Sequence, residues 1–364
     1  MRKVVFALSD LGRGGIQRQV SLLSRSLSDQ WEPHIWSMAG GATAREITAA
    51  GIDLVIHERK FTKDISPLFK YISYIRKVKP DVVHSWDWMS SFSSFAACRL
   101  TGIPHISGSI RLGGLEGMKR RRIPVLLSAR LGNLALANNY AGIKAWNIDP
   151  NKAKVLYNGF EESRMNGVTV VPVAERPGPF TVVMAAWMAE RKDYPSYIEA
   201  ARLLEKKHGP GQFRCVCLGS GPQMDELMAR AGDLISTGTV VFPGKTGEVI
   251  PYLVEAHAAV MMSVFGEGIS NSIMEYMVCG LPVVCSDNGA NREIVVEEET
   301  GFFVPPFSSE QLAERLEQLR NNPVMASEMG MTGRETVLNK FGLGKMAGNA
   351  EKIYTDLLRS MGRI

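Results

Sequence analysis

The sequence lacks any long apolar run. After a short run from Val4 to Leu8 the chain turns polar and glycine-rich, and no later segment reaches the roughly 18 uninterrupted apolar residues that a membrane-spanning helix needs. The first run is also too short for the apolar region of a secretory signal peptide. We therefore expect neither a leader nor a membrane anchor, and a cytoplasmic location.

Paired cysteines, repeats and nucleic-acid motifs are also missing. The five cysteines (98, 215, 217, 279 and 285) include no Cys-x-x-Cys pair of the kind that binds zinc, so we expect reduced thiols. No segment repeats at a fixed period, and no zinc finger or RNA-binding signature occurs. What is present, 364 residues with 45% hydrophobic and 22% charged side chains, is typical of a soluble globular protein of two domains.

Charge is distributed unequally along the chain. Residues 1–168 hold 24 Lys and Arg against 13 Asp and Glu, a balance of +11, whereas residues 169–364 hold 18 against 24, a balance of −6. A cationic first half indicates that this half meets something large and anionic. Nucleic acid and an acidic membrane surface both carry such charge, and the missing nucleic-acid motifs favour the membrane.

Short β-rich segments alternate with amphipathic helical segments through both halves. In the first half, KVVFALS at 3–9 precedes a glycine-rich turn and a helical stretch with Val20, Leu23 and Leu27 on one face. Such alternation predicts an α/β fold with two doubly wound parallel sheets that have helices on both faces. The carboxyl ends of both sets of strands are expected to face a cleft, where ligands bind.

The alternation lapses between residues 155 and 180, where an Asn-Gly pair and three prolines occur. We therefore predict a first domain at 1–168, a linker at 169–178 and a second domain at 179–344. The amphipathic helix at 345–364 has no strand after it, so we expect it to cross back and pack on the first domain.

The stretch FGEGISNSIMEYMVCGLPVV, from Phe265 to Val284, combines a small flexible loop with a helix start at Ser270. A helix start of this kind offers backbone N–H groups and a positive dipole end to an anion. Two glutamates eight positions apart, Glu267 in the loop and Glu275 one turn into the helix, point toward the same place. Phosphate donors beside two hydroxyl-binding carboxylates match the ribose, diphosphate and sugar of a sugar nucleotide. The structural alternative is that each glutamate lies there only because the helix dipole stabilises a negative charge near the helix N-terminus.

Several motifs together give the chain a family resemblance. FGEGISNSIMEYMVCGLPVVCSDNGANREIV resembles the E-x7-E region of the retaining glycosyltransferases of family four, which have the GT-B fold. GRGGIQRQV, LYNGF, MAERKD, LGSGP and VVFPGK are similar to further segments of that family, so the resemblance covers essentially the whole chain. It implies that residues 1–168 bind the acceptor and that residues 179–344 bind the nucleotide sugar.

The resemblance also implies roles for single residues. Glu267 would contact hydroxyls of the donor sugar, Glu275 the nucleotide ribose, and Lys192 the diphosphate leaving group. The remaining residues implied at the donor site are Gly14, Gly15, Gly268, Ile269, Ser270 and Asn271. In the family an arginine usually precedes the lysine, but Trp187 stands there in this chain, so Arg191 is the candidate for the missing charge.

Strand ends of the first half supply further candidates. His84 ends the segment VVHSW and could hold a sugar hydroxyl or the acceptor, although such a histidine is equally often structural. Arg111 follows another strand and could pair with a phosphate; a surface role is as common. Trp86 and Trp88 could stack on an acceptor sugar.

The densest basic run consists of Lys119, Arg120, Arg121 and Arg122, directly before an apolar stretch. On a cationic domain this run predicts a site for anionic lipid headgroups, with about 1 kcal/mol for each cation near the surface. A solvated basic face is the alternative.

These observations predict a metal-independent retaining glycosyltransferase that uses a UDP- or GDP-sugar and no cofactor. Its acceptor would be a glycan or lipid-linked glycan in cell-surface polysaccharide or glycolipid assembly, at the cytoplasmic face of the membrane, and nucleic acid is not expected as a partner. Two alternatives stay open, a sugar-nucleotide epimerase or hydrolase of the same fold and a non-catalytic sugar-nucleotide-binding protein. A dinucleotide-dependent dehydrogenase is disfavoured, because GRGG at 12–15 does not complete G-x-G-x-x-G.

Overall fold

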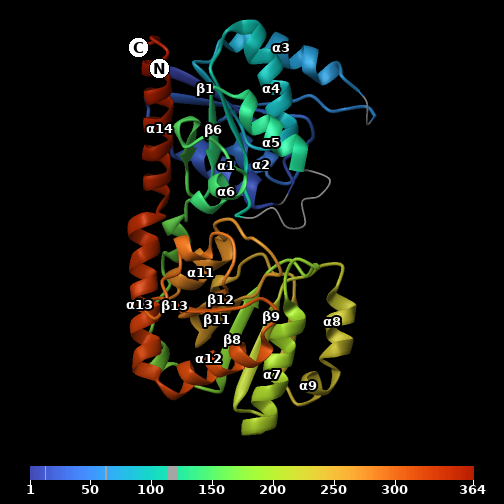
Figure 1. Cartoon of the computed structure of the whole chain (residues 1–364), viewed down its shortest axis with the longest axis vertical. Helices are drawn as coiled ribbons and strands as arrows, with labels where there is room; N and C mark the ends of the chain where they lie inside the picture. The colour runs from blue at the N-terminus through green and yellow to red at the C-terminus, as the bar shows by residue number, and fades with distance from the viewer. Residues whose placement is uncertain (13, 62–63, 114–121) are drawn as a thin grey trace. The chain divides into compact units, whose positions relative to one another are not determined.

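The computed structural model describes residues 1–12, 14–61, 64–113 and 122–364, and the chain divides into two units. Unit 1 consists of Met1–Glu161 together with Phe341–Ile364, and unit 2 of Glu162–Lys340. Each unit holds one parallel sheet covered by helices (Figure 1). The predicted α/β class with two Rossmann-like sheets is therefore confirmed.

The sheet of unit 1 has the strand order β3-β2-β1-β4-β5-β6-β7. Its strands are β1 (Arg2–Leu8), β2 (Trp31–Ser37), β3 (Asp53–Ile56), β4 (Val82–Ser85), β5 (His105–Ile110), β6 (Leu134–Ala137) and β7 (Ala153–Val155). Chain order reverses at the β1–β4 pair, where Val5 lies opposite Val83. Right-handed crossovers then place helices on opposite faces on either side of this pair.

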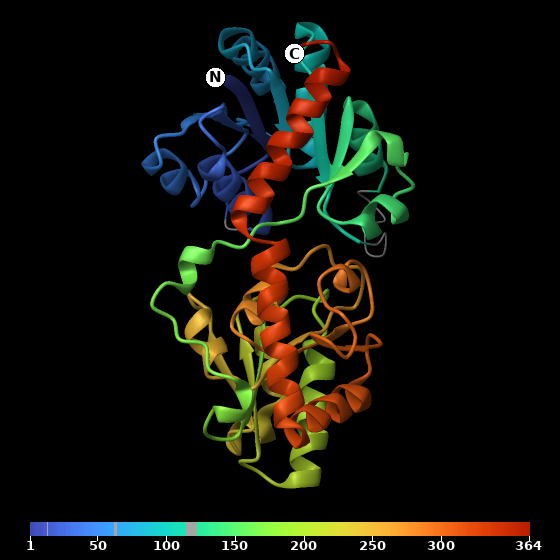
Figure 2. The ribbon, with the colours of Figure 1, turned by 90° about the vertical axis from the view of Figure 1, so that its left-hand side faces the viewer.

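Helices cover both faces of this sheet. One core joins α1 (Gly15–Ser26), α2 (Ala44–Ala49) and α14 (Leu343–Ser360) to the face that carries Phe6 and Leu8. Figure 2 shows α14 running across that face. On the other face lie α3 (Ser66–Val78), α4 (Trp88–Thr101) and α5 (Arg122–Leu131), packed on Val5 and Ile110 among others. The short helix α6 (Tyr140–Ala145) follows β6.

The sheet of unit 2 has the order β10-β9-β8-β11-β12-β13. Its strands are β8 (Phe180–Ala185), β9 (Phe213–Leu218), β10 (Val240–Gly244), β11 (Ala258–Met261), β12 (Val283–Ser286) and β13 (Gly301–Val304). The α-helices are α7 (Tyr194–His208), α8 (Met224–Arg230), α9 (Gly232–Ser236), α10 (Ile250–Val254), α11 (Asn271–Val278), α12 (Ser309–Asn321) and α13 (Pro323–Lys340). The central strands β8 and β11 are mostly apolar and buried, as is usual for strands that have helices on both faces.

The boundary between the units differs from the one predicted. It falls at Glu161/Glu162 instead of at residue 168, and residues 169–178 pack on unit 2 instead of forming a free linker. The cause is Arg176, which is 8% exposed and donates to the carbonyl of Leu253 at 3.0 Å and to that of Cys279 at 2.8 Å. A buried guanidinium with several acceptors fixes the segment, although its prolines and glycines indicated a linker.

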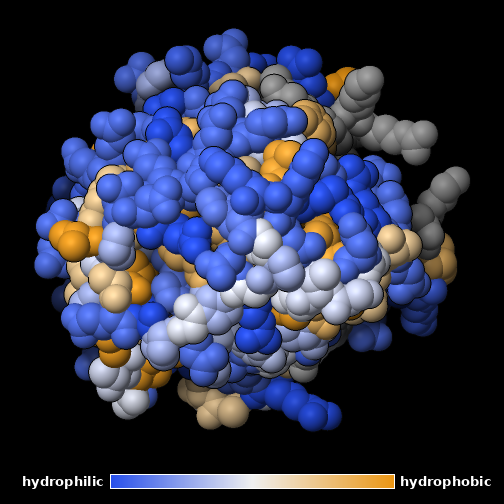
Figure 3. Space-filling model, turned by 90° about the horizontal axis from the view of Figure 1, so that it is seen from below, coloured by the Kyte–Doolittle hydropathy of each residue, from blue (hydrophilic) through white to orange (hydrophobic). Residues whose placement is uncertain are grey.

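Within the described ranges, no helix has the length and apolar character that crossing a membrane requires. Figure 3 shows one end of the molecule, which is mostly hydrophilic and has its apolar residues in separate spots. Such scattered apolar residues are ordinary on a protein surface.

Candidate functional site

The strand order of unit 2 reverses between β8 and β11. β8 continues to β9 on one side and β11 to β12 on the other, so the loops that follow β8 and β11 leave the sheet side by side. Open parallel sheets bind ligands at such a point, outside the carboxyl ends of the strands. The two loops, 186–193 and 262–270, carry most of the side chains expected at the donor site.

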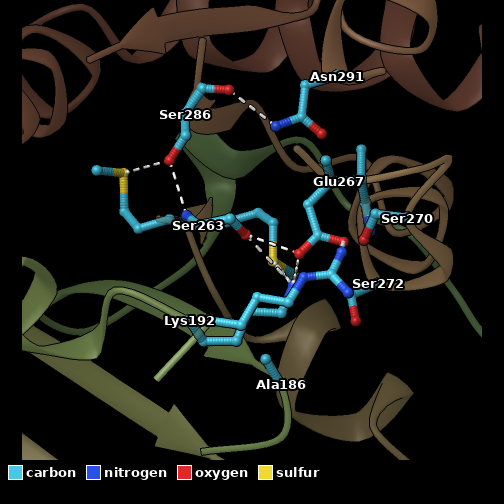
Figure 4. A network of polar contacts seen from close by, with 12 residues as sticks. Ala186, Lys192, Ser263, Glu267, Ser270, Ser272, Ser286 and Asn291 are labelled. Carbon is cyan, nitrogen blue, oxygen red and sulfur yellow. Dashed lines mark hydrogen bonds and ion pairs between the residues drawn. The ribbon is translucent and has the colours of Figure 1, made fainter. Parts of the chain in front are cut away.

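Glu267 lies in the second loop and is held by three side chains (Figure 4). Its Oε1 accepts hydrogen bonds from Lys192 Nζ at 2.5 Å and from Ser263 Oγ at 2.9 Å. Its Oε2 lies 3.0 Å from Arg191 Nη2. Because Glu267 is only 8% exposed, these two cations compensate a carboxylate that is almost removed from water. The structure thus brings together Glu267, Lys192 and Arg191, as the sequence indicated.

The surroundings keep this carboxylate ionised. Burial raises the pKa of Glu267, but the charges of Lys192 and Arg191, with hydrogen bonds from Lys192 and Ser263, lower it further, so the pKa lies below its ordinary value. An ionised carboxylate accepts hydrogen bonds and cannot act as an acid.

Residues after β12 fix the backbone of the Glu267 loop. The amide of Ser263 donates to Ser286 Oγ at 2.8 Å, and the amide of Ala290 donates to the carbonyl of Glu267 at 2.8 Å. Gly289 has a φ of +58°, and a Cβ at this position would collide with the backbone N and O of Glu267. Only glycine combines this conformation with such a close approach.

The loop 186–193 is fixed from its other side. A Cβ on Gly221, in the LGSGP segment, would collide with the backbone of Met188, so the two loops touch backbone to backbone. The amide of Val264 donates to the carbonyl of Arg191 at 3.0 Å and joins this loop to the Glu267 loop. The cations and the carboxylate are therefore held on a common rigid frame.

Helix α11 begins next to this cluster. Ser270 is its N-cap and accepts a hydrogen bond from the amide of Ile273 at 3.4 Å. Ser272 Oγ donates to the carbonyl of Ala185, the last residue of β8, at 2.9 Å. The predicted helix start is confirmed, and it lies at the strand reversal. The other residues expected here lie around the same helix start: Gly268, Ile269 and Asn271.

Glu275, in α11, has a cationic partner that sequence reasoning missed. Its Oε1 lies 2.6 Å from Arg164 Nη1, and Arg164 Nη2 lies 2.5 Å from Glu248 Oε1. Glu275 is 7% exposed, so Arg164 compensates its buried charge. Arg164 precedes Glu275 by 111 residues, and no motif pairs the two.

Trp187, at the position where the family usually has arginine, is 62% exposed. It lies on the loop that carries Arg191 and Lys192, but its side chain points to solvent and brings no charge. A cavity of about 340 Å³ opens on the α7 side of Lys192, lined among others by Glu190, Gln223 and Arg230.

In unit 1 the structure shows two of the candidate residues buried. His84 is 0% exposed, and its Nδ1 lies 2.9 Å from the hydroxyl of Tyr354, which fits the structural alternative for this histidine. Trp86 is 1% exposed: His84 stacks on it at 4.6 Å, and the guanidinium carbon of Arg111 lies 4.4 Å from the ring centre. Trp86 therefore has no ring face open to an acceptor sugar. These contacts with Tyr354, with Arg111 and between the two rings account for the burial of His84 and Trp86.

The remaining candidates of unit 1 are more accessible. Trp88 is half-buried, at the start of α4. Gly14 and Gly15 are exposed where β1 leads into α1, and Gly14 has the extended backbone angles −149° and 168°, which other residues also adopt. Arg111 is half-buried, and burial lowers its pKa to about 10.

The basic run lies mostly outside the described residues. Lys119, Arg120 and Arg121 are not described, whereas Arg122 is exposed and begins α5. A second cavity, of about 640 Å³, opens at the carboxyl ends of β1, β2 and β3, lined by Ser9, Met38, Glu58 and Arg59 among others.

Two family models match the chain. One, described as Glycosyltransferase Family 4, matches residues 13–128, and the other, Glycosyl transferases group 1, matches residues 179–322. Together they take in about seven tenths of the chain.

Individual relatives in sequence are also glycosyltransferases by name. The chain is 21% identical to the UDP-Gal:alpha-D-GlcNAc-diphosphoundecaprenol alpha-1,3-galactosyltransferase of Escherichia coli, over 81% of this chain and 80% of that protein. It is 26% identical to the lipopolysaccharide core biosynthesis glycosyltransferase LpsE of Rhizobium meliloti, over 83% of this chain and 84% of that protein. Its match with EpsD of Bacillus subtilis is 29% identical but covers 50% of this chain and 46% of that protein.

In fold, the chain is similar to HepE of Anabaena. The complex of HepE with UDP has a TM-score of 0.81 and 17% identity, over 97% of this chain and 100% of that one. The complex of HepE with UDP-glucose has a TM-score of 0.80 and 18% identity, over 98% of this chain and 100% of that one. With both sheets, the strand reversal and the matched models in agreement, the chain belongs to the family 4, group 1 glycosyltransferases, and its two units have the GT-B fold.

Proposed function

We propose that this glycosyltransferase moves a sugar, with retention of its anomeric configuration, from a nucleoside diphosphate sugar to a hydroxyl of a glycan or lipid-linked glycan. The observation that carries the proposal is the Lys192–Glu267–Arg191 cluster at the strand reversal of unit 2. Two cations and one ionised carboxylate on a rigid frame match a diphosphate and a sugar diol.

In this proposal, donor binding rearranges the ion pairs around Glu267. In the structure both cations pair with Glu267. The diphosphate, with more negative charge, attracts Lys192 and Arg191, and Glu267 then accepts hydrogen bonds from sugar hydroxyls. Charge grows on the diphosphate as it leaves, so the two cations stabilise the transition state more than the ground state. Arg191 replaces the arginine that the family has at the position of Trp187, and no metal is required in this scheme.

A retaining reaction without a covalent intermediate fits the ionised and hydrogen-bonded carboxylate of Glu267. Its carboxylate has a lowered pKa and is already bound by a lysine, an arginine and a serine, so it is a weak nucleophile. We propose instead a reaction on one face of the sugar. The bond from the anomeric carbon to the phosphate oxygen breaks, the acceptor oxygen bonds to the same face, and its proton passes to the departing phosphate. A sugar trapped covalently on Glu267 would contradict this scheme.

The rest of the donor is assigned to α11. Its N-terminus supplies backbone N–H groups and a positive dipole end for a phosphate. Glu275 accepts hydrogen bonds from the ribose, while the ion pair with Arg164 holds its carboxylate in place.

The acceptor is assigned to unit 1. The cavity of about 640 Å³ at the carboxyl ends of β1 to β3 offers Ser9 and Glu58 for hydroxyls and Arg59 for an anionic group. A lipid-linked acceptor would bring the protein to an anionic membrane surface, where the excess of cations in residues 1–168 is favourable. The E. coli relative, whose name specifies a diphosphoundecaprenol-linked acceptor, supports this class.

The test is a thermal-shift panel of UDP-, GDP-, ADP- and dTDP-sugars in the presence of a chelator. We expect one nucleotide to stabilise the wild type and Trp187→Ala, but not Glu275→Ala. That nucleotide sugar is then incubated with a lipid-linked glycan. Formation of a longer glycan supports transfer, whereas free sugar or an epimerised donor as the main product would favour a hydrolase or epimerase.

Trp187 stands where the family usually has an arginine, and this favours one alternative function, that of a sugar-nucleotide-binding protein without catalysis. If the wild type and Lys192→Ala both bind the donor and neither forms any product, the result supports this alternative and contradicts the proposal.

A further inference from the structure

The helices α3, α4 and α5 form one face of unit 1 with an unusual charge composition. Together they contain six basic residues and no Asp or Glu. The six are exposed, and none has an ion-pair partner among the residues that the structure describes: Lys70, Arg76, Lys77, Arg99, Arg122 and Arg130. Soluble surfaces normally mix both signs. Helix α7 of unit 2 does so, with glutamates and lysines on neighbouring turns.

The same face exposes large apolar side chains at two helix starts. Ile65 and Phe69, at the beginning of α3, are 67% and 63% exposed. Ile123 and Leu127, in the first turns of α5, are 69% and 48% exposed. Residues four apart lie on the same side of a helix, so each helix presents an adjacent apolar pair. We call these four residues the apolar pairs.

The two pairs belong to helices on one face of the sheet. α3 and α5 each follow a strand of the same parallel sheet, and both pack on the face that carries Val5 and Ile110. Helix α4 packs between them on the same face, which Figure 1 shows. The nearest acidic side chain before α3, Asp64, accepts hydrogen bonds from the amides of Lys60 and Ser66 at 2.9 Å and forms no ion pair with a cation of the described helices α3, α4 and α5.

We propose that the α3–α4–α5 face docks on an anionic lipid bilayer, with the apolar pairs entering the boundary between headgroups and acyl chains. The inference rests on the proposed function for its purpose, since a lipid-linked acceptor must be reached at a membrane. Exposed aliphatic side chains match acyl chains, which a nucleic acid does not offer, and the surrounding cations match lipid phosphates. A second copy of this chain would present the same positive face and be repelled.

The surface differs from the one predicted from sequence. The basic run at 119–122 indicated lipid headgroups, but only Arg122 of that run lies among the described residues. The apolar pairs had no sequence signature, because isoleucine, leucine and phenylalanine at helical spacing normally face a core.

The test is co-sedimentation of the full chain with phosphatidylcholine vesicles, with and without phosphatidylglycerol. We expect binding only to the anionic vesicles, weakened by salt. Ile65→Ser with Phe69→Ser should weaken it about tenfold or more, and Lys70→Gln with Arg130→Gln about fivefold for each cation removed.

Matched control variants lie in unit 2. Val324 is 67% exposed on α13, so Val324→Ser removes an equally exposed apolar side chain. Lys206→Gln with Arg214→Gln removes two exposed cations elsewhere. Both controls should bind vesicles as the wild type does. A loss of equal size in the controls, equal binding to neutral vesicles, or no binding at all would overturn the proposal, and so would a dimer that Ile65→Ser with Phe69→Ser disrupts while vesicle binding persists.

A fluorophore gives a local readout, because the five native cysteines are buried and leave an introduced thiol as the reactive one. An environment-sensitive dye on Phe69→Cys should shift to the blue with anionic vesicles, and the same dye on Val324→Cys should not. Donor binding, measured by thermal shift on each variant, separates the two hypotheses. If the wild type binds the donor but not the vesicles, only this inference is wrong. If it binds the vesicles but no donor, the proposed function is wrong and the lipid-binding surface remains.

Discussion

The hydroxyl of Tyr354 lies 2.9 Å from Nδ1 of His84, although 270 residues separate the two in sequence. Both side chains are fully buried. The contact ties the C-terminal helix α14 to the end of β4, in the middle of the unit 1 sheet. It also makes His84 part of the packing of unit 1 instead of an exposed group at a ligand site.

Tyr354→Phe should destabilise the protein by about 1–3 kcal/mol, because it leaves a buried imidazole nitrogen without its partner. The melting temperature and urea titration of the purified protein measure the loss. Tyr252→Phe, at a half-exposed tyrosine of unit 2, should change the free energy of unfolding by less than about 0.5 kcal/mol. Equal stability of Tyr354→Phe and wild type would show that the hydrogen bond contributes nothing.

The protein should lose stability as the pH falls below about 6.5. Burial, followed by Arg111 and His105, lowers the pKa of His84, and burial lowers that of His105 from 6.5 to about 3. The unfolded chain binds protons at these residues near pH 6.5, whereas the folded chain does not, so acid favours unfolding by about 1.4 kcal/mol per pH unit for each histidine.

His105→Gln tests this dependence directly. Glutamine can still reach Ser85 Oγ, which lies 2.8 Å from His105 Nε2, but it does not titrate. The free energy of unfolding of this variant, measured by urea titration between pH 7 and 5, should fall with an average slope smaller by about 1 kcal/mol per pH unit, since the unfolded imidazole is only partly protonated at the upper end of this range. An unchanged slope would mean that His105 is already protonated in the folded protein.

Lys192→Met should lower kcat by about 10²–10³, because the lysine is assigned to charge that develops in the transition state. It should also raise the pKa of Glu267, since the charge of Lys192 helps to hold that pKa down in a buried place. The acid limb of the pH–rate profile would then move to higher pH. A change in KM alone would assign Lys192 to ground-state binding instead.

Gly289→Ala should abolish most activity while leaving the protein folded. An added Cβ would push the backbone of Glu267 away from the position that Lys192 and Arg191 define. Gly238→Ala is the matched control, because Gly238 also has a positive φ, +79°, but has open space around it. Gly238→Ala should lose about 1 kcal/mol of stability from backbone strain, Gly289→Ala should lose more because of the added collision, and only Gly289→Ala should lose transfer activity.

The sequence was most informative about the central strands and the donor loops. Apolar runs such as FTVVMAA and FRCVCLG became β8 and β9, and the Ser270 helix start was correct. The strands β6 (LALA), β7 (AKV) and β13 (GFFV) have no clear signal in the sequence, because segments this short contain too few β-branched residues to be distinguished from loops.

Contacts between distant segments could not be predicted. Nothing in the local pattern of Arg164 indicates that it pairs with Glu275, and nothing in VVHSW indicates that α14 will cover His84. Such pairs depend on how the chain folds back, whereas spacing reports only neighbours along it. Glu267 was indicated by its place before the Ser270 helix start, and Lys192 by the resemblance of MAERKD to the family.

The position of α14 also sets an order of assembly on the ribosome. The core on one face of unit 1 includes Met346, Tyr354 and Leu358, which are translated after the whole of unit 2. Unit 2 is one continuous stretch and can be completed as it emerges, whereas unit 1, although begun first, cannot close its core until the last helix is made. A chain interrupted before α14 would therefore carry a finished unit 2 and a unit 1 with an uncovered apolar face, which chaperones and proteases would recognise.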